Sequence, residues 1–291
     1  MPEPSLLILI PAYNEERRIE PVLREYAGFF GRNYNGKFQI VVVLNGCTDN
    51  TLGVVQRVAA EFPVIHALEF KEPIGKGGAL IEGLKLASRG DLIGYADADG
   101  ATPPQSLLDL TRHIAEADCI VGSRWLPGSV LHQAQTVTRR LFSRAFHSIV
   151  EILFLMRIRD TQCPCKLMRR EVVDRIHSNL RIADLAFDVN LLVSIKRAGF
   201  KILEVPIEWT DQGGSKVTSS LFRSSLTMFL SVLRVRLIYS PFYRMLRPLR
   251  PLEGWIYTRL RAPRPLTTAE VERSKTEAQA SGAEDPRTGR H

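Results

Sequence analysis

Cysteine, histidine and long apolar runs are all sparse in this sequence of 291 residues. None of the four cysteines forms the C-x-x-C spacing of a zinc or redox site, and the six histidines show no ligand spacing either. We therefore expect reduced thiols in a cytosolic compartment. No secretory signal opens the chain, and no apolar stretch reaches the roughly 18 uninterrupted residues that a spanning helix needs. These absences argue against a disulfide-stabilised secreted domain and against a transmembrane protein.

Acidic residues are nearly missing from one segment near the C-terminus. Residues 234–264 contain eight arginines and one acidic residue, Glu253, which is a net charge of +7 against +8 for the whole chain. Such a local excess favours an anionic surface as partner, either a membrane or a nucleic acid. The apolar stretch 220–239 and the aromatic residues among these arginines are typical of helices in a membrane interface. Ordinary buried helices are the alternative. Nucleic acid is disfavoured because the basic block is confined to one segment beside apolar helices.

The rest of the chain alternates between apolar runs and amphipathic stretches with short joints. Continuous apolar runs are typical of buried parallel strands. The alternation predicts an α/β fold with a mostly parallel sheet, right-handed crossovers and flanking helices. The predicted strands cover residues 6–10, 38–44, 64–70, 91–95, 119–121 and 201–209. One helix is predicted to begin at a cap on Asn14, and a second just after Asp49. Further predicted helices cover 79–87, 103–115, 139–156 and 188–198.

Polar clusters follow four of the predicted strands at the point where each strand ends. In sheets of this kind, ligands bind beyond the carboxyl ends of the strands. We therefore expect the clusters to converge on one rim and to form the functional site. They are Pro11–Glu16, Asn45–Asp49, Asp97–Asp99 and Gly122–Arg124.

The segment 92–100, LIGYADADG, is central to this site because it ends a strand with two aspartates. Residues i and i+2 of an extended chain point the same way, so Asp97 and Asp99 can face one point. Two anionic oxygen ligands suit Mg²⁺ or Mn²⁺, which takes its other ligands from water and phosphates. The alternative is a surface Asp-Ala-Asp-Gly turn. The Gly75-Lys76 pair is no P-loop, because it lacks the upstream glycine and the following Ser or Thr.

Eight motifs occur in order along the chain: IPAYNEE (10–16), NGCTDNT (45–51), GKGGAL (75–80), DADG (97–100), GSR (122–124), DTQCPCKLMRRE (160–171), FDVNLL (187–192) and EVPIEWTDQGGSKV (204–217). Together they resemble the family-2 glycosyltransferases of the Rossmann-like GT-A fold. Within that family, they are most similar to the dolichyl- or polyprenyl-phosphate glucose and mannose synthases. The resemblance covers roughly residues 5–240.

The resemblance implies roles for individual residues. Asp97 and Asp99 would hold Mg²⁺ or Mn²⁺ against the donor diphosphate, and Asp188 would be the remaining carboxylate of a general-base pair. Arg124 would also be catalytic. The other implied positions bind substrate. They are Pro11, Tyr13 and Glu15 in the nucleotide pocket, Asn45, Asp49 and Lys76 near the base and ribose-phosphate, Arg124, Asp160 and Gln162 near the sugar or acceptor phosphate, Arg139, Arg140 and Arg144 toward the lipid phosphate, and Lys216 on a loop over the diphosphate.

Two positions depart from the family pattern. An aspartate is usual where this chain has Asn45, which retains hydrogen bonding to a base but loses the charge. The motif F-D-V-E becomes F-D-V-N at Asn190, which weakens a general base. A phosphate monoester has a second pKa of about 6 and is already anionic at pH 7, so it needs no base, whereas a hydroxyl acceptor does. The pattern is therefore compatible with a lipid-phosphate acceptor.

We therefore expect an inverting, metal-dependent hexosyltransferase. It would move glucose from a nucleoside-diphosphate sugar such as UDP-glucose to a polyprenyl phosphate at the cytoplasmic face of a membrane, as a peripheral or monotopic protein. Mannose transfer from GDP-mannose, a soluble enzyme with a hydroxyl acceptor, and nucleotide binding without turnover are the alternatives. The expected organisation is a catalytic domain (1–217), a membrane-interface segment (218–264) and a disordered tail (265–291). Whether the chain forms a homo-oligomer is left open by the sequence.

Overall fold

The computed structural model describes residues 3–132, 137–184, 186–210 and 221–240. By contacts, the chain divides after Leu260. All described residues lie in the first unit. The predicted boundaries after residues 217 and 264 fall outside the described ranges and stay predictions.

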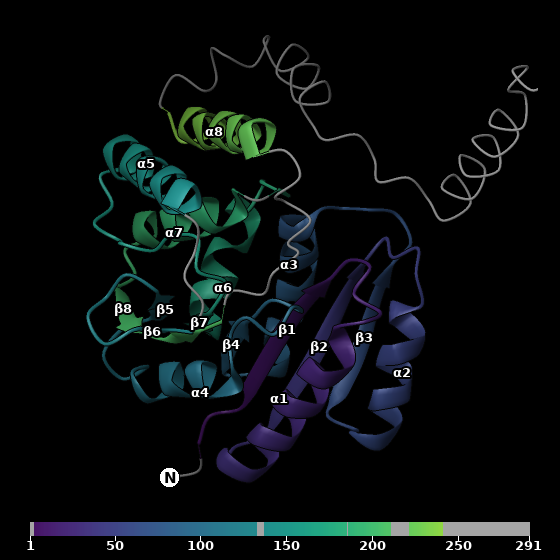
Figure 1. The fold of residues 1–291 in the computed structure, drawn as a ribbon. Helices are drawn as coiled ribbons and strands as arrows, with labels where there is room; N and C mark the ends of the chain where they lie inside the picture. Colours follow the sequence, from purple (N-terminus) through teal and green to yellow (C-terminus); the bar gives the residue numbers. More distant parts are fainter. Residues whose placement is uncertain (1–2, 133–136, 185, 211–220, 241–291) are drawn as a thin grey trace, which may run out of the picture. The chain divides into compact units, whose positions relative to one another are not determined.

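A seven-stranded sheet in the order β3-β2-β1-β4-β7-β5-β8 forms the centre of this unit (Figure 1). Every neighbouring pair is parallel except those of β7, which runs antiparallel to both β4 and β5. The predicted α/β class with a mostly parallel sheet is thus confirmed. The strands are β1 (Leu6–Ala12), β2 (Phe38–Asn45), β3 (Ile65–Phe70), β4 (Leu92–Tyr95), β5 (Cys119–Ser123), β7 (Lys166–Arg169) and β8 (Ile202–Pro206); β6 (Val130–Leu131) and β9 (Glu208–Trp209) form a separate parallel pair.

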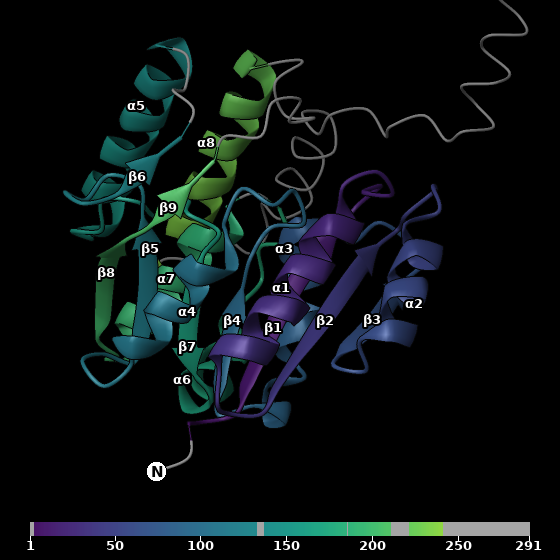
Figure 2. The same cartoon turned by 60° about the horizontal axis from the view of Figure 1, so that its bottom comes forward.

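Helices cover both faces of the sheet, as Figures 1 and 2 show. One apolar cluster lies between the sheet and the first, second and fourth helices, and a second cluster lies on the opposite face. The first layer contains α1 (Ile19–Asn33), α2 (Thr51–Glu61) and α4 (Pro104–Arg112). The second layer contains α3 (Lys76–Leu84), α5 (Val137–Phe154), α6 (Arg170–Ile176), α7 (Phe187–Arg197) and α8 (Leu221–Ile238), with short 3₁₀ turns at Ala87–Arg89 and His177–Asn179.

Strand β1 shows why an uninterrupted apolar run is needed at the centre. Successive side chains of a strand point to opposite faces. Leu6, Ile8 and Ile10 accordingly join the cluster beside α1, whereas Leu7 and Leu9 join the cluster beside α3. All five are at most 1% exposed, and each contributes about 1.5–3 kcal/mol by burial. The strand positions the polar loop that follows it.

Two of the differences from the sequence-based expectation concern strands of the central sheet. Strand β7 was not predicted, because only Leu167 and Met168 are apolar in it and charged residues stand at both ends. The predicted strand 201–209 is divided into β8 and β9, which belong to different sheets. Strands β7, β8 and β9 are all too short for the alternation of their side chains to be recognised in the sequence.

Candidate active site

The loop after β1 is fastened to the loop after β2 at the carboxyl edge of the sheet. The backbone N–H of Thr48 donates to Asn14 Oδ1 at 2.7 Å, and the N–H of Glu16 donates to Asp49 Oδ2 at 3.2 Å. Asn14 has a φ of +53° and does not cap a helix, because α1 begins only at Ile19. That expectation was wrong: the asparagine side chain bonds to a neighbouring loop instead of to the N–H groups of its own helix.

Asn45 connects the end of β2 to the start of α3. Its side chain is 7% exposed, and its Oδ1 accepts the N–H groups of Ile74 at 2.7 Å and Gly75 at 3.1 Å. An aspartate could accept the same two bonds, so the departure from the family pattern preserves this contact. A role of Asn45 toward a nucleotide base stays a prediction.

The glycines around Lys76 are required by the close approach of the segment that precedes α7. Gly75 has a φ of +82°, and a Cβ there would lie 2.3 Å from the carbonyl oxygen of Ala183. A Cβ on Gly77 would lie 2.6 Å from Phe187 Cβ and 2.7 Å from the carbonyl oxygen of Ile182. The first turn of α3, which carries Lys76, is thereby packed against the N-terminal end of α7.

We expect Gly77→Ala to lower the free energy of unfolding by about 1–3 kcal/mol, because the added methyl group overpacks this contact. Gly31→Ala in α1 is the matched control, since no neighbouring atom lies within 4 Å of a Cβ there. The control should gain up to about 1 kcal/mol from the helix propensity of alanine. Urea unfolding of both variants measures the difference, and equal effects would contradict the packing argument.

Asp97 and Asp99 follow β4 directly, as predicted, and Lys76 lies against them. Lys76 Nζ is 2.6 Å from Asp97 Oδ1, and Asp99 Oδ1 accepts the N–H of Ala101 at 3.0 Å. Burial and the charge of Asp97 raise the pKa of Asp99. Burial alone would lower the pKa of Lys76, but the charges of Asp97 and Asp188 outweigh it and the pKa is raised. The effect of Asp97 on the pKa of Asp99 indicates that the two carboxylates lie near each other, with the ammonium group of Lys76 against the first.

The donor set fits a hard divalent cation. Asp97 and Asp99 offer carboxylate oxygens, and Lys76 already places one positive charge against the first of them. Among the described residues, no group of three or more His, Cys, Asp or Glu could hold a metal ion. A cation held by the two aspartates would therefore take further ligands from water and from a bound diphosphate, as Mg²⁺ commonly does.

Arg124 and Asp160 form a buried two-pronged ion pair at the end of β5. Arg124 Nε and an Nη donate to the two oxygens of Asp160 at 2.7 and 2.8 Å, and the Arg124 backbone N–H donates to it at 3.0 Å. The guanidinium also lies 4.9 Å from the centre of the Trp209 ring. Nearby, the Nε2 of Gln162 is buried without a hydrogen-bond partner among the described residues. The structure thus brings Arg124 and Asp160 together, and Gln162 follows Asp160 by two residues in the chain.

The Arg124–Asp160 pair should make stability depend on pH at the acid end. Burial would raise the pKa of Asp160, but Arg124 overcomes this effect and the pKa is lowered. The stabilisation is fully present above the unfolded pKa of about 3.9 and is lost as pH falls through the lower folded pKa. In urea titrations between neutral pH and pH 3, Asp160→Asn should be less stable than the parent at neutral pH. The difference in the free energy of unfolding between the two proteins should shrink below pH 4. A difference that does not change with pH would contradict this role of the ion pair.

Asp188 lies in the core beside two residues that sequence reasoning did not select. Lys166 Nζ and Tyr95 Oη each donate to Asp188 Oδ1 at 2.5 Å, and Lys166 Nζ also donates to the Cys163 carbonyl at 2.5 Å. Lys166 is fully buried and Asp188 is 4% exposed. A lysine at the first position of a short strand is the one local signal for this pair.

Asn190, two residues further along α7, has a structural role. It is 1% exposed, and its Oδ1 accepts the N–H groups of Arg181 at 2.9 Å and Ile182 at 3.3 Å. Its Nδ2 donates to Tyr239 Oη at 3.0 Å. Asn190 therefore connects α7 to the preceding loop and to the residue just after α8.

The other predicted site residues are distributed as follows. Pro11 is buried in β1, and Tyr13 is half-buried in the loop after it. Glu15 accepts two hydrogen bonds from Arg18 at 2.7 and 2.8 Å. Asp49 bonds to both the N–H and the hydroxyl of Thr51 at the start of α2. Arg139 and Arg140 lie in α5, but their side chains are outside the description, the Arg144 guanidinium lies 5.9 Å from the Trp125 ring centre, and Lys216 falls outside the described residues.

The fold and the site together define an α/β domain with two aspartates and a lysine at the carboxyl edge of its mostly parallel sheet. The model of the family described as Glycosyl transferase family 2 matches residues 7–176. AglD, a glycosyltransferase of Haloferax volcanii, is 33% identical over 233 residues, which cover 78% of this chain and 36% of AglD. The dolichyl-phosphate beta-glucosyltransferase of Dictyostelium discoideum is 33% identical over 246 residues, which cover 80% of this chain and 74% of that protein. This chain belongs to glycosyl transferase family 2.

A solved structure supports the fold. Glucosyl-3-phosphoglycerate synthase from Mycobacterium tuberculosis, crystallised with Mn²⁺, UDP and glucosyl-3-phosphoglycerate, matches with a TM-score of 0.61 at 18% identity. The match covers 82% of each chain. The predicted family and the GT-A fold are thus confirmed. The chain spans only about a third of the length of AglD.

Proposed function

We propose that this chain transfers a hexose, glucose in the first place, from a nucleoside-diphosphate sugar such as UDP-glucose to a polyprenyl phosphate. The observation that carries the proposal is the cation site at the end of β4, where Lys76 lies 2.6 Å from Asp97 and the pKa of Asp99 is raised by burial and by Asp97. A donor diphosphate needs positive charge at the carboxyl edge of the sheet. The name of the Dictyostelium relative supports the choice of glucose and of dolichyl phosphate.

Asp97 and Asp99 are the residues that would hold Mg²⁺ or Mn²⁺. When bound, such an ion supplies charge neutralisation for the departing nucleoside diphosphate. Lys76 would add a second positive charge, because its ammonium group is already positioned at Asp97. An oxygen of the acceptor phosphate would attack the anomeric carbon as the bond to the diphosphate breaks, which inverts the configuration.

The environment of Asp188 favours a phosphate acceptor over a hydroxyl acceptor. Asp188 is buried and shares one carboxylate oxygen with Lys166 and Tyr95. Asn190 carries no charge, and its oxygen accepts two backbone N–H groups. A hydroxyl acceptor requires a base to remove its proton. A phosphate monoester is already ionised at neutral pH, so it can react without one.

A membrane surface is the proposed place of the reaction, on its cytoplasmic face. None of the helices in the described ranges is long and apolar enough to cross a membrane. The predicted interface segment, 218–264, includes α8, while its residues beyond Ser240 lie outside the described part. The support comes from the chemistry of the acceptor, whose polyprenyl chain is soluble only in lipid, and from the eight arginines of residues 234–264.

Transfer of labelled hexose into an organic-extractable product tests the proposal. Purified protein, Mg²⁺ or Mn²⁺ and a polyprenyl phosphate are incubated with UDP-glucose and, in parallel, with GDP-mannose. We expect lipid-soluble label from UDP-glucose that disappears when the divalent ion is chelated. Lipid-soluble label from GDP-mannose alone would show that the transferred hexose is mannose and not glucose. Metal-dependent release of nucleoside diphosphate without lipid label would contradict the acceptor and point to a hydroxyl acceptor.

A further inference from the structure

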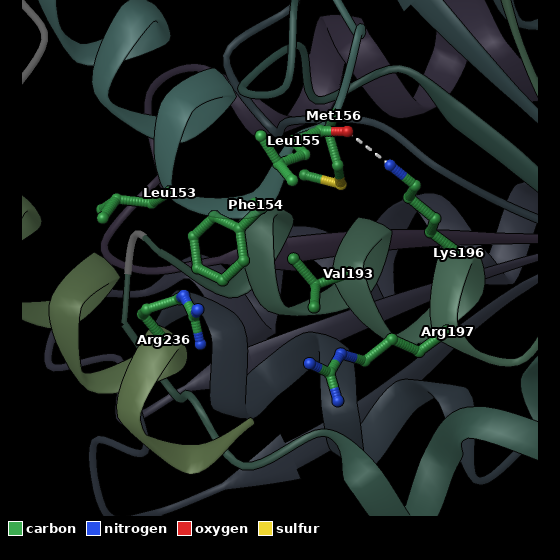
Figure 3. A pocket seen from close by; sticks show the side chains of 8 residues that line it. All are labelled: Leu153, Phe154, Leu155, Met156, Val193, Lys196, Arg197 and Arg236. Atoms are coloured by element: carbon green, nitrogen blue, oxygen red, sulfur yellow. Dashed lines mark hydrogen bonds between the residues drawn. The ribbon is translucent and has the colours of Figure 1, made fainter. Parts of the chain in front are cut away.

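A cavity of about 320 Å³ opens where the C-terminal ends of α5 and α7 meet α8. Figure 3 shows that apolar side chains and three cationic side chains line it together. The apolar wall includes Phe154, Met156 and Val193, and the cations are Lys196, Arg197 and Arg236. No acidic residue is among the lining residues. The cavity therefore combines an apolar interior with a concentrated positive charge.

Backbone carbonyl groups position two of the three cations without neutralising them. Lys196 Nζ donates to the carbonyl of Leu155 at 2.5 Å, and an Nη of Arg197 donates to the carbonyl of Tyr239 at 3.0 Å. Within the described part of the chain, no carboxylate pairs with these two residues or with Arg236. The last turn of α7 also favours cations because of the helix dipole. An anionic group entering the cavity would meet three positive charges that no carboxylate of the described residues offsets.

Leu155 lies beside this charge in a backbone conformation that leucine rarely adopts. It follows the last residue of α5 with a φ of +51°, at a position where helices usually have glycine or asparagine. Its side chain is nevertheless 78% exposed, and the nearby Ile152 is 72% exposed. The fold gains almost no burial from either residue. A strained position that presents a large apolar side chain to the outside indicates a function.

We propose that this cavity binds the phosphate headgroup of an anionic membrane phospholipid, while Leu155 and Ile152 enter the acyl layer beside it. The three cations match the phosphate, and the apolar wall matches the glycerol and the first methylene groups. The cavity lies away from the residues that we propose for hexosyl transfer. Asp188 and Lys196 are eight positions apart on α7, which is about 12 Å along the helix axis. It is the Asp188 end that packs against the turn carrying Lys76.

The proposal rests on the proposed function only in that the acceptor lies in a membrane. Binding itself needs neither donor nor acceptor. It can therefore be measured on the full chain without any transfer reaction, so that a failure of one proposal is distinguishable from a failure of the other.

The first test is sedimentation with vesicles of phosphatidylglycerol and phosphatidylcholine in equal parts, and with vesicles of phosphatidylcholine alone. We expect Lys196→Gln/Arg236→Gln to bind the anionic vesicles about 30-fold more weakly than the parent. The control is Arg32→Gln/Lys37→Gln, which removes the same charges from exposed positions at and beyond the end of α1, in the opposite helix layer. It should lose less than threefold. Equal losses in both variants, or no preference of the parent for anionic vesicles, would overturn the proposal.

The second test uses Leu155→Gly, which separates membrane contact from folding. Glycine relieves the positive φ, so the thermal midpoint should stay the same or rise. Binding to both kinds of vesicle should nevertheless weaken severalfold, while transfer to a water-soluble, short-chain polyprenyl phosphate stays within twofold of the parent. Unchanged vesicle binding would show that Leu155 does not enter the lipid and would overturn that part of the site.

Discussion

Asp99→Ala is expected to reduce hexosyl transfer by about a thousandfold or more, with the fold intact. A divalent ion at this site is worth several kcal/mol of charge stabilisation in the transition state, and about 4 kcal/mol corresponds to a thousandfold. Removal of the side chain should cost little stability. Burial and the charge of Asp97 raise the pKa of Asp99, so its ionised form is disfavoured in the folded protein.

Initial rates with labelled donor, together with urea unfolding curves, measure both effects. Asp109→Ala is the matched control, because Asp109 lies on the surface of α4, paired with Arg112 at 2.7 Å. The control should retain full activity. Substantial activity of Asp99→Ala at any Mg²⁺ or Mn²⁺ concentration would remove the aspartate pair from the mechanism. Loss of activity caused by unfolding would be recognised from the unfolding curve.

Lys166→Met is expected to lower the free energy of unfolding by about 3–5 kcal/mol, the largest stability effect that we expect in this chain. The substitution leaves Asp188 as an uncompensated charge in the core, which is the costly way to break a buried ion pair. The Lys166 ammonium lies 2.5 Å from that carboxylate and has no exposed surface. Urea unfolding at neutral pH measures the loss.

A double-mutant cycle separates this charge effect from simple loss of packing. In Lys166→Met/Asp188→Asn the remaining partner is neutral, and its amide oxygen can still accept the hydroxyl of Tyr95. The loss in the free energy of unfolding should therefore be at least about 2 kcal/mol smaller in the double variant than the sum of the losses in the two single variants. Additive losses would show that the pair is held by packing alone.

Much of the fold could be predicted because the relevant information lies in neighbouring residues. The apolar runs at β1 and β2 are buried on both faces, so each is continuous and easily recognised. The placement of Asp97 and Asp99 at the end of β4 followed from the position of a short strand and from the alternation of its side chains. The convergence of the loops after β1 and β2 followed from the rules of parallel sheets.

The remaining features depend on segments that are distant in the sequence. Lys166 and Asp188 are 22 residues apart, and Arg124 and Asp160 are 36 residues apart. No local pattern states which charged residue will meet which partner in the core. The Lys166–Asp188 pair depends on the position of β7 between β4 and β5. Strand β7 is too short to be recognised from the periodicity of its side chains.

The amino-acid order was thus sufficient for the α/β class and the acidic pair at the sheet edge, because these depend on side-chain alternation and short connections. The family was recognised from the resemblance of its motifs. Chain packing in three dimensions was needed to find that Lys76 lies against Asp97, that Asp188 is buried with Lys166, and that α5, α7 and α8 enclose a cationic cavity. The physical reason is that hydrophobic periodicity is a short-range property, whereas the pairing of charges and the shape of a cavity arise only when distant segments pack together.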